Sequence, residues 1–299
     1  MDKQFNIRKI ATKKIFVSDD YLPLSKSLMT LPIFTATNQT KAVQLNIKAK
    51  SFFSYENLEI NTEPLTLNHD FNVFIYIIQK LTKNPSHKII LDIKEYQQQN
   101  NIARQNLQVY REKINSTLKK FQNLSISFEK KDRKYTCGFI NYSKEVGNNQ
   151  IEIEISPGLL FLYEADKDLI FNLRLDKYKK IKSLYAKALY LFYLSNNKNT
   201  LNIFNKDYIA YRLQCGHLEN KVFNKNIRAA HKELLKLELI EKVEEVKYGP
   251  KVLKYKVIVL DKRPLNVDPT PAETNEEKAA ITEEDLTTNN DICDDDIPF

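Results

Sequence analysis

The chain has 299 residues, a formal net charge of +8 and 42% apolar residues, so it is long enough for roughly two domains with real cores. It has no charged segment followed by an apolar stretch at its start and no apolar run near ~20 residues, which argues against export and against a membrane span. Cys137, Cys215 and Cys293 are odd in number and far apart, as expected in a reducing cytoplasm without a disulfide framework.

The net charge conceals a basic body and an acidic C-terminal segment. Residues 264–299 hold eleven Asp or Glu and one Lys, a charge of −10, so the remaining residues carry +18. A body that basic favours a polyanionic partner, most commonly nucleic acid. A basic protein without such a partner has the same composition, so function has to be argued from the pattern of residues.

In chain order, the first half predicts a winged helix after a flexible basic N-terminus of residues 1–20. Beyond some strand-like stretches, NHDFNVFIYIIQKLTK predicts a helix capped by Asn68, with apolar residues at the spacing of a buried stripe. A strand, KIILDI, a polar helix, KEYQQQNN, and a longer helix over residues 104–121 follow. LSISFE and YTCGFINYS then predict a hairpin across the turn KKDRK. Helix, strand, two helices and a hairpin is the order of a winged helix.

The second half repeats this order of elements. IEIEIS predicts an opening strand, residues 176–195 a helix, TLNIF a strand and residues 205–212 a helix capped by Asn205. After a turn at Gly216, residues 219–237 predict a long helix, and LIEKVEEV and VLKYKVIVL predict a hairpin across KYGPK. We therefore predict an α+β fold with two tandem winged-helix domains, over residues 21–150 and 151–263. A disordered acidic C-terminal tail, residues 264–299, follows, because that segment has no apolar periodicity.

The helix predicted over residues 219–237 has two chemically distinct faces. Phe223, Ile227, Ala230, Leu234 and Leu237 form an inward stripe, and basic and amide side chains lie opposite. Arg and Asn bind guanine and adenine edges in the major groove, and Lys binds phosphate. A merely solvated helix face is the plainer interpretation, but its third place in a winged helix favours DNA. The candidate DNA-binding residues of this module and its wing are Lys221, Asn224, Lys225, Arg228, Lys232, Lys247 and Lys251.

The matching helix of the first half is less basic, and Glu112 on it would repel phosphate. We expect the second module to make most of the base contacts. The first module would contact DNA more weakly, also through the turn that contains Lys130, Lys131 and Arg133. A dimer surface and a purely structural role stay open for it. Its candidate DNA-binding residues are Arg104, Gln105, Gln108 and Arg111.

Enzyme signatures are missing from the sequence. It has no G-x-x-x-x-G-K-[ST] nucleotide-binding motif, and its four histidines are scattered. Cys215 and His217 are too small a set to hold zinc, and we expect His217 in a loop and His231 on the flank of a helix. We therefore predict no catalytic residue, no metal and no cofactor.

Three longer stretches resemble the plasmid replication initiators built from two winged helices. They are LPLSKSLMTLPIFTATNQTK with LEINTEPLTLNHDFNVFIYIIQKL, then ISPGLLFLYEADKDLIFNLRLDKYKKIKSLYAKALYLFYL, and FNKNIRAAHKELLKLELIEKV. The resemblance covers roughly residues 20 to 262. It implies a cytoplasmic protein that binds repeated double-stranded origin sites, assists melting and recruits host replication proteins without covalent chemistry. It also implies copy control, since many such proteins repress their own promoter as dimers.

The last six residues resemble the C-terminal hexapeptide of bacterial single-stranded-DNA-binding protein. In that family the final Phe and its carboxylate enter an apolar pocket with a basic rim on client proteins. The resemblance implies that the tail docks on a host polymerase accessory subunit, primase or helicase. A charge shield over the basic helices and an accidental ending are the alternatives. The residues concerned are Asp294, Asp295, Asp296, Ile297, Pro298 and Phe299.

Two other functions fit the same body. A winged-helix transcriptional repressor would recognise a promoter palindrome rather than direct repeats beside AT-rich DNA. A single-stranded-DNA-binding accessory protein would prefer single strands at fixed salt, because phosphate contacts make affinity steeply salt-dependent. A nicking enzyme would cleave supercoiled origin DNA, and we expect no cleavage.

Overall fold

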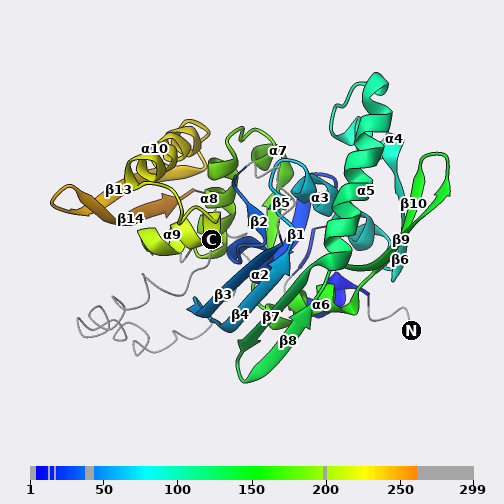
Figure 1. The fold of residues 1–299 in the computed structure, drawn as a ribbon, viewed down its shortest axis with the longest axis horizontal. Helices are drawn as coiled ribbons and strands as arrows, with labels where there is room; N and C mark the ends of the chain where they lie inside the picture. Colours follow the sequence, from blue (N-terminus) through cyan, green and yellow to red (C-terminus); the bar gives the residue numbers. More distant parts are fainter. Residues whose placement is uncertain (1–4, 13, 17, 38–43, 198–200, 261–299) are drawn as a thin grey trace. The chain divides into compact units, whose positions relative to one another are not determined.

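The computed structural model describes residues 5–12, 14–16, 18–37, 44–197 and 201–260 (Figure 1). All of these residues belong to one compact unit, Met1–Asp261. No helix among them combines the length and the apolar character that a membrane span requires. Cys137 and Cys215 are buried free thiols.

A first winged helix is formed by residues 70–155. α3 (Asp70–Lys83), β6 (Lys88–Asp92), α4 (Ile93–Gln99) and α5 (Leu107–Asn123) follow in the predicted order, with a 3-10 turn at Arg104–Asn106 before α5. β9 (Ile140–Gly147) and β10 (Gln150–Ile155) complete an antiparallel sheet in the order β6-β10-β9. The inward side chains of this sheet close the core against α3 and α5, because alternate residues of β6 and β10 are buried.

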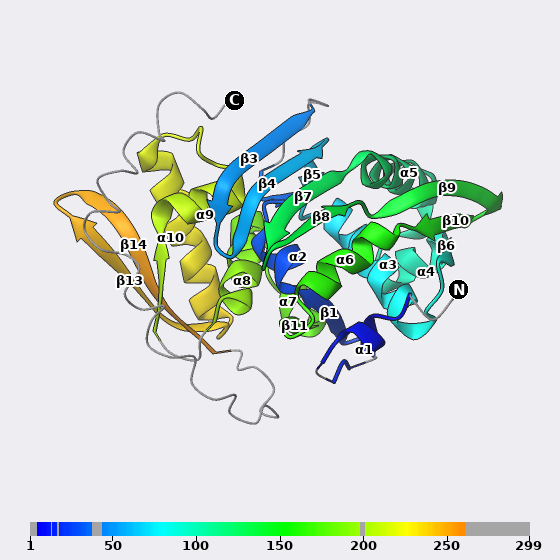
Figure 2. The ribbon, with the colours of Figure 1, turned by 90° about the horizontal axis from the view of Figure 1, so that it is seen from below.

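The wing of this module is not the predicted hairpin. LSISFE and the start of YTCGFINYS do pair, as β7 (Ser125–Lys130) and β8 (Arg133–Cys137). These strands continue a separate four-stranded sheet with β3 (Leu45–Phe52) and β4 (Tyr55–Thr62), as Figure 2 shows. The pairing of β7 with β4 sets apolar Ile126 opposite Ile60, a match between segments distant in sequence that local alternation does not reveal.

IEIEIS, predicted to open the second module, is β10 and completes the sheet of the first module. The pairing of β10 therefore places residues 150–155 in the sheet of the first module, so this sheet continues across the predicted boundary between residues 150 and 151. α6 (Pro157–Ala165) follows, with Pro157 at its start and Ser156 as its cap.

A second winged helix follows the same plan. It contains α8 (Leu184–Ser195), β12 (Asn202–Asn205), α9 (Lys206–Leu213), α10 (Asn220–Lys236), β13 (Ile240–Tyr248) and β14 (Lys251–Val259). Its sheet order, β12-β14-β13, is the order of the first module's sheet. The two modules thus repeat each other as predicted, although LSISFE and IEIEIS do not take their predicted places, and the repeat extends to the pairing of the strands.

Two predicted helix starts are displaced, and one is correct. Asn68 does not cap α3, because the helix begins at Asp70, whose carboxylate accepts from the Thr66 amide at 2.6 Å. The predicted helix over residues 176–195 is broken into α7 (Leu175–Tyr178) and α8, which the Ser183 hydroxyl caps. Asn205 caps α9 as predicted, accepting from the Asp207 amide at 3.0 Å.

The N-terminal segment packs onto both modules. α1 (Ile7–Ile10) lies within the stretch predicted as a flexible N-terminus, and Ile7 is buried. β1 (Tyr21–Ser25) pairs with β11 (Ile170–Arg174), and β2 (Phe34–Thr35) pairs with β5 (Leu65–Thr66). Between them, α2 (Lys26–Thr30) has four buried residues, two of them polar side chains with partners across the fold.

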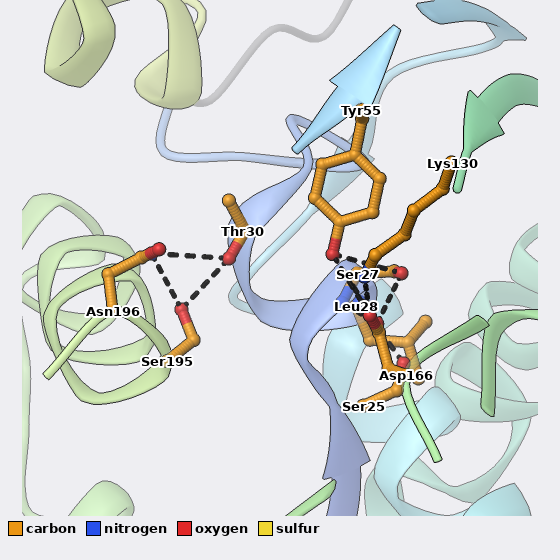
Figure 3. A network of polar contacts seen from close by, with 9 residues as sticks. All are labelled: Ser25, Ser27, Leu28, Thr30, Tyr55, Lys130, Asp166, Ser195 and Asn196. Carbon is orange, nitrogen blue, oxygen red and sulfur yellow. Dashed lines mark hydrogen bonds and ion pairs between the residues drawn. The ribbon is translucent and has the colours of Figure 1, made fainter. Parts of the chain in front are cut away.

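On one side, α2 is tied to the end of α6 and to the four-stranded sheet by a buried ion pair (Figure 3). The Asp166 carboxylate accepts from the Ser27 amide at 2.5 Å and from the Ser27 hydroxyl, and it pairs with Lys130. The Tyr55 hydroxyl lies 3.4 Å from the same carboxylate. Lys130, predicted as a DNA contact, is therefore buried and does not face solvent.

On its other side, the α2 segment is tied to the second winged helix. The Thr30 and Ser195 hydroxyls lie 3.0 Å apart, and the Asn196 amide donates to the Thr30 hydroxyl at 3.2 Å (Figure 3). Arg212 of α9 is fully buried and donates to the carbonyls of Met29 and Phe34, both at 3.1 Å. A single short segment thus joins the second winged helix to α6 and the four-stranded sheet through buried polar groups.

Candidate nucleic-acid interface

α10 is an amphipathic helix whose apolar stripe faces the sheet of the second module. Phe223, Ile227, Ala230 and Leu234 are buried as predicted, and Leu237 is half-buried just beyond the helix. His231, expected on the flank, is also buried, and its Nε2 lies 2.7 Å from the Tyr193 hydroxyl. The core therefore takes up a wider strip of the helix than the apolar residues alone predict.

The opposite face of α10 presents the predicted basic residues to solvent. Lys221, Lys225, Arg228 and Lys232 are exposed, at successive turns of one helix face. Asn224 is half-buried, and its Oδ1 is buried without a hydrogen-bond partner among the described residues. The four basic side chains are thus accessible to a polyanion, whereas Asn224 is less accessible.

Arg228 is held by the wing. Its Nε and Nη2 donate to the two carboxylate oxygens of Glu245 on β13, at 2.6 and 3.0 Å. Lys247 lies 3.0 Å from the same carboxylate. These partners, the Arg228 hydrogen bonds foremost, lower the pKa of Glu245 to about 2. Arg228 and Lys247 are predicted DNA contacts, whereas nothing in the sequence points to Glu245, because this pairing joins residues 17 positions apart in different elements.

The tip of this wing carries both charge and an aromatic ring. Lys247 and Lys251 are exposed on either side of the β13–β14 turn, where Gly249 has a φ of +55° that favours glycine. Tyr248 is 79% exposed, the highest fraction among the exposed large apolar residues. The sequence signal for Tyr248 was its place in the turn KYGPK, next to the Gly-Pro pair.

In the first module the candidate residues are less available. Arg104 and Gln105 are exposed in the 3-10 turn that precedes α5. The Gln108 amide donates to Glu112 at 3.0 Å, and Arg111 is half-buried and donates to the Asn149 amide oxygen at 3.1 Å. Two of the four side chains are therefore already hydrogen-bonded within the module.

The described part of the chain holds no group of three His, Cys, Asp or Glu side chains placed to bind a metal ion. The tail residues Asp294, Asp295, Asp296, Ile297, Pro298 and Phe299 lie outside the described residues.

Comparisons with known proteins converge on one family. A family model described as "Initiator Replication protein, WH1" matches residues 34–193. RepFIB replication protein A of Escherichia coli is 25% identical over 240 residues, which cover 75% of this chain and 71% of that protein. The protein of the same description in Salmonella typhi has the same identity and coverage.

Among solved structures, domains 2 and 3 of RctB resemble this chain with a TM-score of 0.54. The sequence identity is 11%, and the alignment covers 82% of this chain and 98% of the RctB chain. This likeness covers both modules and supports the α+β fold with two winged helices. At 11% identity it shows similarity of fold alone.

Proposed function

Because the chain belongs to the plasmid replication initiator family, we propose that it binds repeated sites in the double-stranded DNA of an origin, helps melt the adjacent duplex and recruits host replication proteins. In this proposal the protein acts in the cytoplasm through binding alone, with no covalent step and no cofactor. The observation that carries the proposal is the exposed basic row on α10 beside a basic wing.

The geometry of that row suits a duplex groove. An α-helix fits the major groove of B-DNA, where Arg contacts guanine edges and Lys contacts phosphates. Arg228 at the centre of the exposed face would contact bases, and Lys221, Lys225 and Lys232 would contact the flanking backbone. Lys247 and Lys251 on the wing would contact the neighbouring strand. The first module would add weaker contacts through Arg104 and Gln105.

The DNA-binding proposal is tested by selection from random duplexes. The full chain is incubated with a pool of random 30-bp duplexes, and the bound DNA is recovered and sequenced. We expect a shared motif, and its recurrence as direct repeats beside an AT-rich stretch of the plasmid would support origin binding over repression from a palindrome.

A combined variant then links the motif to α10. Lys221→Gln, Lys225→Gln and Arg228→Gln together should weaken binding to the selected duplex by at least a hundredfold, because each substitution removes one contact with the DNA. The salt dependence of binding should fall as well, since phosphate contacts are lost. Lys9→Gln, Lys48→Gln and Lys167→Gln form the matched control, because they remove the same charge from exposed lysines that lie outside α10 and its wing. Undiminished binding by the folded α10 variant would contradict the proposal.

The C-terminal tail supplies the proposed recruitment. Ile297 and Phe299 offer apolar area, Pro298 limits the entropy lost on docking, and the three aspartates offer charge to a basic rim. Deleting residues 297–299 should abolish capture of host replication proteins that bind the single-stranded-DNA-binding protein tail. Deleting residues 287–289 removes as many residues and should leave capture unchanged. Equal capture by both variants would exclude recruitment through the hexapeptide.

A further inference from the structure

The contact between Arg228 and Glu245 has a counterpart in the first module. There the Asn115 amide on α5 donates to Glu145 on β9 at 3.0 Å. Asn115 and Arg228 are each the ninth residue of a 17-residue helix, and Glu145 and Glu245 are each the sixth residue of the first wing strand. Both modules therefore tie the same turn of the third helix to the same point of the wing.

The two ties differ in charge. In the first module a neutral amide donates to the Glu145 carboxylate. In the second module a guanidinium meets Glu245 through two parallel hydrogen bonds, a geometry that fixes the plane of the guanidinium as well as its position. Lys247, on the same strand as Glu245, lies 3.0 Å from the same carboxylate. The contact between helix and wing is therefore next to the basic residues at the tip of the wing.

Arg228 can still donate hydrogen bonds to a ligand while it is paired with Glu245, because Nη1 takes no part in that pairing. Nε and Nη2 are used by Glu245, while the Arg228 side chain stays 55% exposed and that of Glu245 only 17%. The carboxylate thus lies on the protein side and the guanidinium on the solvent side. A nearby acid also cancels the attraction that a free arginine would have for any phosphate.

From these observations we propose that Glu245 is a positioning residue for DNA specificity. It presents Arg228 to base edges in one orientation and suppresses sequence-independent phosphate binding by the same side chain. The inference rests on the proposed function, since it assumes that α10 binds duplex DNA.

The test is Glu245→Gln in the full chain, measured against the duplex selected by the wild-type chain and against a random duplex of equal length. Glu244→Gln is the matched control: it removes the same charge from the adjacent residue, which pairs with Lys242 at 2.6 Å on the other face of the strand. We expect Glu245→Gln to bind the random duplex more tightly, with a salt slope steeper by about 0.9. The ratio of specific to random affinity should fall about tenfold, the discrimination of one bidentate contact.

An Arg228→Gln background shows whether Glu245 acts through Arg228. In that background Glu245→Gln should no longer change the ratio. If Glu245→Gln lowers both affinities equally, or if Glu244→Gln has the same effect, the contact is structural or a matter of net charge and the inference is wrong. If the wild-type chain selects no motif at all, it is the proposed function that fails.

Discussion

At the scale of single residues, His231 is a buried base between two tyrosines. Its Nε2 bonds to the Tyr193 hydroxyl, and the Tyr255 ring lies 5.1 Å away. Burial lowers the pKa of His231 to about 4. Between that value and the ordinary pKa near 6.5, the unfolded chain binds a proton that the folded chain does not.

Stability should therefore fall as the pH decreases from 6.5 towards 4, by about 3 kcal/mol at the lower end. Urea unfolding at steps of pH measures this loss. His231→Gln should flatten the slope. The remainder should come from His69, whose pKa burial also lowers, and near the lower end from Glu245, whose pKa falls from 4.5 to about 2 on folding. An unchanged pH dependence in His231→Gln would show that His231 is not the group responsible.

The buried pair of Asp166 and Lys130 is a second residue-scale feature with a measurable consequence. Asp166→Asn leaves the Lys130 ammonium buried without its counter-charge, and we expect a loss of about 3–5 kcal/mol in urea unfolding. Adding Lys130→Met should restore part of that loss, because the uncompensated charge is then gone. A double variant less stable than Asp166→Asn would contradict this account.

At the scale of elements, helix periodicity was the most reliable sequence signal and strand partnership the least. The stripe on α10 depends on residues three or four positions apart and was predicted correctly, whereas α3 is buried on nearly every side and not along one stripe. LSISFE was predicted as a wing strand, yet β7 pairs with β4, because the partner of a strand is chosen by apolar complementarity across the whole fold.

The break before α8 yields an element-scale prediction. The Ser183 hydroxyl accepts from the Ala186 amide, and the Glu233 carboxylate accepts from the Lys182 and Ser183 amides. Ser183→Ala should cost about 1 kcal/mol in unfolding free energy, while Ser183→Thr, which keeps an accepting hydroxyl, should cost less. Equal stability of all three proteins would show that Glu233 alone satisfies this helix start.

At the scale of the whole molecule, the acidic segment offsets much of the basic charge. Removing residues 264–299 changes the formal net charge from +8 to +18. The truncated chain should bind a random duplex more tightly and with a steeper salt dependence, as a stronger positive field predicts. Deletion of residues 297–299 alone removes no charged side chain and should leave random binding unchanged. Titrations of both variants at several salt concentrations would separate a charge effect from docking by the hexapeptide.

The sequence by itself determined the helical faces, the order of elements in two similar modules and the division of charge. Each of these depends on residue type and on spacing within a few positions, so no distant partner is needed to predict it. Only the tertiary structure decided which strands share a sheet and which charges are already paired. Lys130 with Asp166, Arg111 with Asn149 and Arg228 with Glu245 are examples. A charged side chain binds whichever partner the fold brings within about 3 Å, and the fold selects that partner from anywhere in the chain.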